Sequence, residues 1–260
     1  MPETPAETCR FFLDALRRTM LHYGLWFAGT ARNHGLAAAL EAEREAGDRW
    51  TALTLKRLAK TLGVPLTGDG LPAPLADLPP ETLQALAKAA AVNWLAADGV
   101  WFQAVESRHG MAAAKAVNDG CWESFSPIEA RRIAALTELP PDPLEALKTA
   151  LGYRLYARIN EQEIVDETPT GFTFRMTRCR VQDARKRQGL ADYPCKSGGM
   201  VEYTGFARTI APGVTTTCLY CPPDPHPDDG WCAWRFERKG EGRLFRKGPR
   251  TWGGMGTSSR

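Results

Sequence analysis

Apolar residues recur every three to four positions along the first part of the chain, which is the period of an α-helix. Residues 9–62 follow this pattern, and Gly35 and the Gly47-Asp48 pair interrupt it, so we expect helices that break at these glycines. A segment rich in Pro, Gly and Asp, residues 65–80, then predicts a linker. A second helical stretch begins at Glu81, directly after two prolines that suit a helix start.

The two helical stretches carry the same landmarks, a constant 75 residues apart. Because matching of this length does not arise by chance, we infer an internal duplication, with residues 1–64 as the first copy and 81–140 as the second. Two copies are too few for a solenoid and favour a paired helical bundle. The corresponding segments are Gly24–Phe27 with Gly99–Phe102, and His34–Ala39 with His109–Ala114.

Two acidic residues distinguish the second copy, which has Asp98 and Glu106 where the first copy has Tyr23 and Ala31. On a helix, Asp98 shares an apolar stripe with Phe102, where a carboxylate is costly unless it is paired. Asp98 is therefore predicted either to hydrogen-bond to a neighbouring helix or to face a ligand. For a ligand site we expect Asp98 and Glu106 to be catalytic.

The period changes after residue 140, where a helix gives way to short strand-like runs. Helices first and antiparallel strands later predict an α+β fold, with a Cys-rich domain of helices on an antiparallel sheet over 141–237. Residues 238–260 are basic and glycine-rich, and we expect them to form a disordered, solvated tail rather than a contact with RNA or a membrane. The expected elements are a helix over 144–159, a hairpin around 169–171, helices over 181–188 and 199–210, and strands over 214–220 and 231–236.

Five of the seven cysteines lie between residues 179 and 232. Cys218 and Cys221 have the two-residue spacing that can turn both thiolates toward one metal ion. The first interpretation is a zinc site formed by Cys195, Cys218, Cys221 and Cys232. An iron–sulfur cluster ranks below zinc, because a single Cys-x-x-Cys is much less than the usual run of cluster ligands.

A second interpretation makes one thiol catalytic. Cys179 lies between Arg178 and Arg180, whose positive charge would lower the pKa of its thiol and favour a nucleophile. Asp98 or Asp224 would then carry the proton. In a third interpretation, the cysteines are simply buried apolar residues.

The substrate pocket would need apolar walls and groups that grip a polar ligand. We expect Trp101 and Phe102 to supply walls, and Arg180 and Arg208 to hold a carboxylate or phosphate by paired hydrogen bonds. The alternative for both arginines is ordinary surface charge. Domain junctions commonly hold such pockets, so we predict a cleft between the helix around Asp98 and the sheet that carries Cys179 and Cys218.

Composition narrows the partners and the compartment. The net charge of +3 is too small to imply nucleic-acid binding, and no helix-turn-helix or nucleotide-binding loop indicates a transcription factor or a kinase. The N-terminus shows no signal peptide, and no run reaches the ~18 apolar residues of a membrane span. We therefore expect a cytoplasmic protein with reduced thiols, a small-molecule ligand, and no nucleic-acid or membrane partner.

Three resemblances add to these expectations. The segment Phe206–Gly213, followed by Cys218, resembles the L-2-amino-thiazoline-4-carboxylic acid hydrolase family, which has a similar turn before a cysteine-bearing strand. The segment Gly230–Phe236 looks like the closing strand of vinyl-reductase-type ligand-binding domains, which implies helices packed on an antiparallel sheet. Most of residues 81–237 also resembles an uncharacterised bacterial family of two-part cytosolic proteins.

The residues and the resemblances together predict a thiolate- or metal-dependent hydrolase. Its substrate would be a small carboxylated molecule containing sulfur or nitrogen, and the bond broken would join carbon to nitrogen. The alternatives are a non-catalytic module that senses a small molecule or a metal, and a structural zinc protein that docks a partner.

Overall fold

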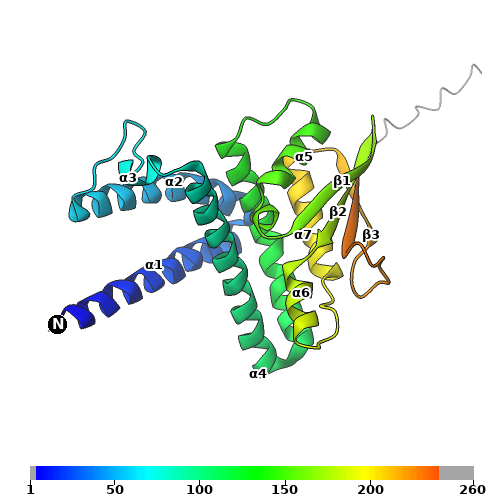
Figure 1. Cartoon of the computed structure of the whole chain (residues 1–260), viewed down its shortest axis with the longest axis horizontal. Coiled ribbons are helices and arrows are strands. Elements are labelled where there is room, and N and C mark those ends of the chain that lie inside the picture. The colour runs from blue at the N-terminus through cyan, green and yellow to red at the C-terminus, as the bar shows by residue number, and fades with distance from the viewer. Residues whose placement is uncertain (1–3, 240–260) are drawn as a thin grey trace, which may run out of the picture.

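The fold is α+β, as predicted: long helices come first, and a four-stranded antiparallel sheet follows. The computed structural model describes residues 4–239 of the chain. Figure 1 shows the helices to one side of the sheet. The elements are α1 (Pro5–His34), α2 (Leu36–Leu62), α3 (Ala73–Ala76), α4 (Pro80–Leu136), α5 (Pro143–Tyr153), η1 (Leu155–Arg158), β1 (Glu161–Thr168), β2 (Gly171–Arg178), α6 (Arg180–Arg187), α7 (Lys196–Ile210), β3 (Val214–Tyr220) and β4 (Cys232–Arg238).

The two sequence copies have the same fold: a helix, a sharp glycine turn and a returning helix. Gly35 separates α1 from α2 with φ 85° and ψ 162°, and Gly110 divides α4 into two arms with φ 82° and ψ 168°. This region of backbone space is almost exclusive to glycine, so the matched glycines are needed for the two turns. The duplication read from the sequence therefore has a direct structural counterpart.

Each copy is thus a helical hairpin, with α1 and α2 as the arms of the first and the two parts of α4 as the arms of the second. Hydrogen bonds at matched positions join the two arms of each helical hairpin. The Tyr23 hydroxyl donates to Glu43 Oε1 at 3.2 Å in the first copy. In the second copy, Asn118 Nδ2 donates to Asp98 Oδ1 at 3.3 Å. Both partners are shifted by the same 75 residues, so one structural position has exchanged its chemistry between the copies.

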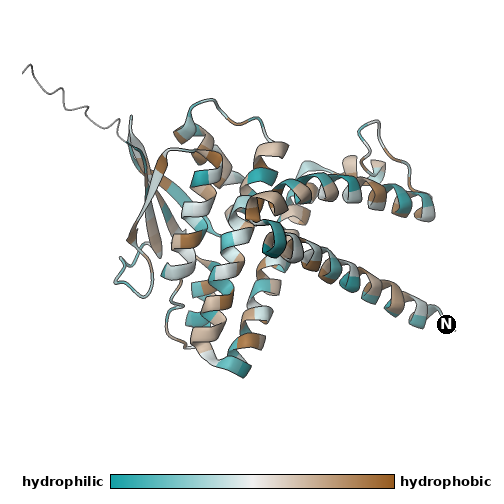
Figure 2. Cartoon of the chain, turned by 180° about the vertical axis from the view of Figure 1, so that it is seen from behind, coloured by the Kyte–Doolittle hydropathy of each residue, from teal (hydrophilic) through white to brown (hydrophobic). Residues whose placement is uncertain are grey.

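The first hairpin stands away from the rest of the chain (Figure 1). Apolar side chains remain exposed on both of its arms, for example Met20 of α1 at 66% and Trp50 of α2 at 43%, and Figure 2 shows brown residues along them. Arg131 and Arg132 of α4 form ion pairs with Glu41 and Asp48 of α2. The second hairpin differs because α7 packs along α4 and covers it.

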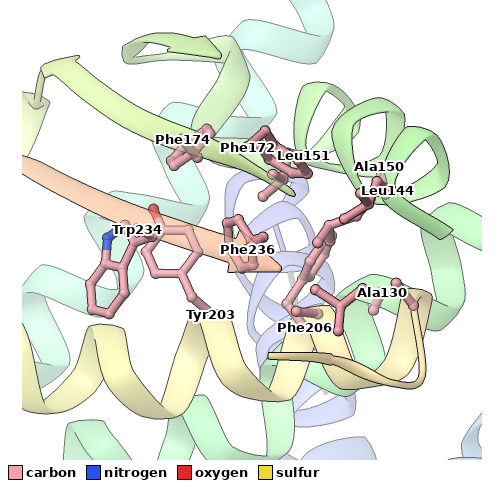
Figure 3. Packing of buried hydrophobic residues seen from close by; sticks show 14 of the residues in the cluster. Ala130, Leu144, Ala150, Leu151, Phe172, Phe174, Tyr203, Phe206, Trp234 and Phe236 are labelled. Carbon is pink, nitrogen blue, oxygen red and sulfur yellow. The ribbon is translucent and has the colours of Figure 1, made fainter. Parts of the chain in front are cut away.

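The sheet has the strand order β1-β2-β4-β3, and every neighbouring pair is antiparallel. β1 and β2 form the predicted hairpin, and the two cysteine-bearing strands β3 and β4 are neighbours as expected. Successive side chains of β2 and β4 point to opposite faces of the sheet, and the apolar ones share one face, which packs under the helices. Figure 3 shows Tyr203 and Phe206 of α7 beside Trp234 and Phe236 of β4 in this core.

Two boundary predictions are wrong. Gly47 and Asp48 lie inside α2, because an isolated helical glycine costs only about 1 kcal/mol and long flanking helix compensates. The helix expected over 144–159 ends at Tyr153, because Arg154 leaves the helical conformation and buries its guanidinium between carboxylates.

The remaining predicted elements are present in the structure, apart from the tail, most of which lies outside the described residues. α3 lies within the predicted linker, and α6 and α7 correspond to the two helices expected after the hairpin. The tail predicted over 238–260 lies outside the described residues from position 240 onward. No helix within residues 4–239 combines the length and the apolar composition needed to cross a membrane.

Candidate functional site

A cavity of about 480 Å³ lies between α4 on one side and α6, α7 and the sheet on the other. Its walls are mostly apolar and aromatic, which suits a small organic ligand. The cavity lies between the second helical copy and the Cys-rich part of the chain. Both Asp98 and Cys179 line it, whereas Cys218 does not. The main wall residues are Leu95, Phe102, Trp122, Tyr156, Met176, Tyr193, Tyr203 and Trp234.

One face of α7 forms the floor of the cavity. Cys195 occupies the N-cap position of the helix, and Gly198, Gly199 and Glu202 follow at helical spacing on the same face. A Cβ on Gly198 would lie 3.0 Å from Asp119 Oδ1, and a Cβ on Gly199 would lie 2.6 Å from the Trp234 ring. These two glycines therefore permit α7 to approach both α4 and the sheet.

Four thiols converge on the cavity: Cys179, Cys195, Cys221 and Cys232. The Sγ atoms of Cys195 and Cys221 are 3.6 Å apart, and Cys221 also hydrogen-bonds with Cys232. Cys218 packs against the hydrophobic core from β3 instead. The Cys218–Cys221 spacing therefore does not turn both thiols to one place, because the chain is extended as far as Tyr220.

Cys195 is the thiol whose surroundings favour the charged form. A hydrogen bond from the Cys221 thiol lowers the pKa of Cys195, and the Gln182 amide and the Lys115 ammonium act in the same direction against the cost of burial. Gln182 Nε2 lies 3.5 Å from Cys195 Sγ. The same amide group donates to the Tyr193 carbonyl at 2.9 Å, and Gln182 Oε1 accepts from the Tyr193 N–H at 2.8 Å. Gln182 thus holds the segment that carries Cys195.

The pKa of the Cys179 thiol is raised, whereas the sequence predicted that neighbouring arginines lower it. Burial raises the pKa of the Cys179 thiol to about 12. Arg178, which was expected to lower it, is exposed and pairs with Glu161 and Asp183, each at 3.2 Å. The adjacent arginines therefore do not activate Cys179, although its side chain does line the cavity.

Asp98 lies on the α4 wall, and burial raises the pKa of its carboxyl group. Its partner Asn118 reaches α7, since Asn118 Oδ1 lies 3.5 Å from the position of a Cβ on Gly198, one turn after Cys195. Both interpretations of Asp98 thus have a counterpart, because it hydrogen-bonds across the hairpin and also faces the cavity. Glu106 and Phe102 line the same wall.

A buried ionic group lies beneath the cavity and was not found by sequence reasoning. Arg154, 2% exposed, donates from Nε to Glu129 Oε2 at 2.8 Å, and its Nη2 lies 2.6 Å from Glu202 Oε1. Glu129 also accepts the Leu155 N–H at 3.0 Å. One guanidinium cannot balance two carboxylates, and burial raises the pKa of Glu202 to about 7.

Glu202 could have been found by the reasoning that identified Asp98, because it is a carboxylate on the apolar face of a helix. Gln182 gave no such signal, since it lies in a polar stretch of sequence. Arg154 gave none either, because it lies inside the segment 144–159 that the apolar pattern predicts as one continuous helix.

Besides Cys218, three predicted site residues do not line the cavity. Asp224 pairs with Lys196 at 2.7 Å, Arg208 is exposed in the last turn of α7, and Trp101 is 64% exposed. Trp101 follows its apolar neighbours in sequence but falls on the outer side of the helix. Arg180 remains at the rim of the cavity, where its backbone N–H donates to Asn160 Oδ1 at 2.9 Å.

The described residues contain no group of three or more His, Cys, Asp or Glu side chains arranged to hold a metal ion. The zinc site expected at Cys195, Cys218, Cys221 and Cys232 is divided, with Cys218 in β3 and the other three thiols on the cavity wall. Zinc and an iron–sulfur cluster therefore stay predictions.

The chain matches no curated protein. The model of a family of unknown function, DUF6125, matches residues 5–79 and 76–238. The two matched segments meet between α3 and α4, at the boundary of the two helical copies. Together they cover nearly all of the described residues, so the chain belongs to the DUF6125 family.

Proposed function

We propose that this protein is an enzyme that hydrolyses a carbon–nitrogen bond of a small molecule, with Cys195 as the nucleophile. The observation that carries the proposal is the position of Cys195, which faces the cavity from the N-terminus of a 15-residue helix. A helix N-terminus favours negative charge, and a thiolate is the reactive form of cysteine.

The surroundings of Cys195 supply the other requirements of a nucleophile. Gln182 and the Cys221 thiol hydrogen-bond to its sulfur, so the thiolate would be held in one orientation. In the first turn of α7, the Lys196 N–H donates to the Pro222 carbonyl and the Gly199 N–H donates to the Cys195 carbonyl. The N–H groups of Ser197 and Gly198 are the remaining donors at this helix end. They would stabilise negative charge that develops on a substrate atom beside Cys195.

Asp98 is the proposed proton donor. Burial raises the pKa of its carboxyl group. At a given pH, Asp98 is therefore protonated in a larger share of the molecules than an exposed Asp would be, and can donate that proton. In the proposed reaction the Cys195 thiolate forms a bond to the substrate carbon, the carbon–nitrogen bond breaks, and Asp98 protonates the leaving nitrogen. With an amide substrate, water then hydrolyses the thioester, which returns the thiol and releases a carboxylic acid. With a cyclic amidine the intermediate is a thioimidate, and its hydrolysis returns the thiol and releases an amide.

The polarity of the cavity supports a substrate class. The acidic side chains of Asp98, Glu106 and Glu202 line the interior, which suits a nitrogen-bearing group. Arg180 at the rim suits a carboxylate. A small molecule with a basic nitrogen at one end and a carboxylate at the other would satisfy both, in agreement with the hydrolase resemblance of the C-terminal half.

Turnover by matched variants tests this proposal. Wild type, Cys195→Ser, Cys218→Ser and Asp98→Asn would be assayed on a panel of small amides and cyclic amidines that carry a carboxylate. We expect Cys195→Ser to abolish turnover, Asp98→Asn to lower it by about 10²–10⁴-fold, and Cys218→Ser to keep it. Full activity in Cys195→Ser, or stoichiometric zinc that is lost together with activity, would overturn the assignment.

A further inference from the structure

We propose that Cys195 and Cys221 form a reversible disulfide and are the oxidation site of this protein, in place of the Cys218–Cys221 pair that the sequence spacing suggests. The inference goes beyond the proposed hydrolysis and holds whether or not Cys195 attacks a substrate.

The two sulfur atoms are already in contact, with Cys195 Sγ and Cys221 Sγ at 3.6 Å. A disulfide needs about 2.0 Å between sulfurs and a Cα–Cα distance of about 4.4–6.8 Å. The neighbouring residues hold the two backbone segments together, since the Lys196 N–H donates to the Pro222 carbonyl at 2.9 Å. Bond formation therefore needs small side-chain rotations and no rearrangement of the fold.

Cys218 is poorly placed to be the partner of Cys221. It lies within β3, opposite Trp234, and the strand continues to Tyr220. At about 3.3 Å per residue, the Cα atoms of residues 218 and 221 lie roughly 10 Å apart in an extended chain. This distance exceeds the range that a disulfide spans, so joining these two cysteines would require the end of β3 to unfold.

The pair also meets the chemical requirements of thiol–disulfide exchange. Cys195 lines the cavity and is partly exposed, so a small disulfide can reach it, and its surroundings favour the thiolate, which is the attacking form. Cys221 is buried and needs to reach only Cys195. In the first step, Cys195 attacks one sulfur of a low-molecular-weight disulfide, forming a mixed disulfide and releasing one thiolate. Cys221 then loses its proton and attacks Cys195 Sγ, which releases the second thiolate.

Electrons and atoms balance in this sequence. The two protein thiols are oxidised to one disulfide, and the small disulfide is reduced to two thiols that take up the two protons. A small dithiol reverses the reaction by the same steps.

Peptide mapping of the full chain tests the proposal. Reduced protein would be incubated with oxidised glutathione, blocked with an alkylating agent and digested with trypsin. Cleavage after Arg187 and Lys196 isolates Cys195 in peptide 188–196, while cleavage after Arg208 and Arg235 leaves Cys218, Cys221 and Cys232 together in peptide 209–235. A Cys195–Cys221 bond joins the two peptides, whereas a Cys218–Cys221 bond stays inside the second.

The expected product is the joined pair of peptides, retained in Cys218→Ser and in Cys232→Ser and absent in Cys221→Ser. Cys221→Ser should instead accumulate glutathione on Cys195, because the second step has no attacking thiol. A bond within peptide 209–235, or a joined product that survives in Cys221→Ser, would overturn the assignment. Absence of any disulfide under conditions that oxidise a small dithiol would overturn it as well.

Discussion

Replacing Glu202 by Gln should remove a pH dependence of stability that originates in the buried ionic group. Arg154 lies between Glu129 and Glu202, and all three side chains are buried. Glu129 accepts two hydrogen bonds. Glu202 is the group whose protonation changes near neutral pH, because burial raises its pKa. The substitution keeps the size of the side chain and removes its ionisable group.

The magnitude follows from the pKa of Glu202, which burial raises from 4.5 to about 7. As the pH rises above about 4.5, the unfolded chain releases this proton while the folded chain keeps it. The stabilising contribution is therefore complete below pH 4.5 and is lost by about pH 7. At about 1.4 kcal/mol per pKa unit, the loss amounts to about 3 kcal/mol.

Urea denaturation of wild type and Glu202→Gln at pH values from 4.5 to 8 measures this contribution. Other groups titrate equally in both proteins, so their effects cancel in the difference between the two unfolding free energies. We expect that difference to shift by about 3 kcal/mol in favour of the variant across this range. Glu123→Gln, at an exposed position of α4, is the control and should follow wild type. Parallel curves for wild type and Glu202→Gln would refute the reasoning.

Three further predictions concern the framework of the site. Gly199→Ala should cost about 1–3 kcal/mol in urea denaturation, because its Cβ would lie 2.6 Å from the Trp234 ring, whereas Gly205→Ala on the same helix meets only ordinary contacts and should not destabilise; equal effects would contradict the packing. Gly110→Ala should lower the melting temperature by several degrees, since φ 82° with ψ 168° costs a non-glycine residue about 1–3 kcal/mol; an unchanged melting temperature would contradict a turn that depends on glycine. A fragment of residues 80–239 should unfold cooperatively in circular dichroism, because the hydrophobic core lies within residues 130–236; a gradual transition would show that the first hairpin is required.

The fold was predictable from sequence wherever local pattern decides it. The duplication, the β1–β2 hairpin and the neighbouring strands β3 and β4 each follow from periodicity and turn residues. The break at Arg154 did not, because it depends on two carboxylates that lie 25 residues before it in α4 and far beyond it in α7. Such long-range pairing leaves no periodic trace in the sequence.

The candidate site was predictable in part for the same reason. Asp98 could be singled out because a carboxylate on an apolar stripe needs a partner, and the second copy could be compared with the first. The roles of the cysteines could not be separated by spacing alone. Extension of β3 takes Cys218 away from Cys221, while the N-terminus of α7 brings Cys195 to it.

The relative reactivity of the cysteines tests the central claim most directly. Reduced full-length protein would be treated at pH 7 with limiting iodoacetamide, and alkylation of each cysteine in the described residues would be followed by mass spectrometry. We predict that Cys195 reacts faster than Cys179 and Cys218, because burial raises the pKa of those two thiols to about 12 and about 11, whereas the pKa of Cys195 is lowered. Faster alkylation of Cys179 or Cys218 than of Cys195 would contradict the assignment of Cys195 as the reactive thiol.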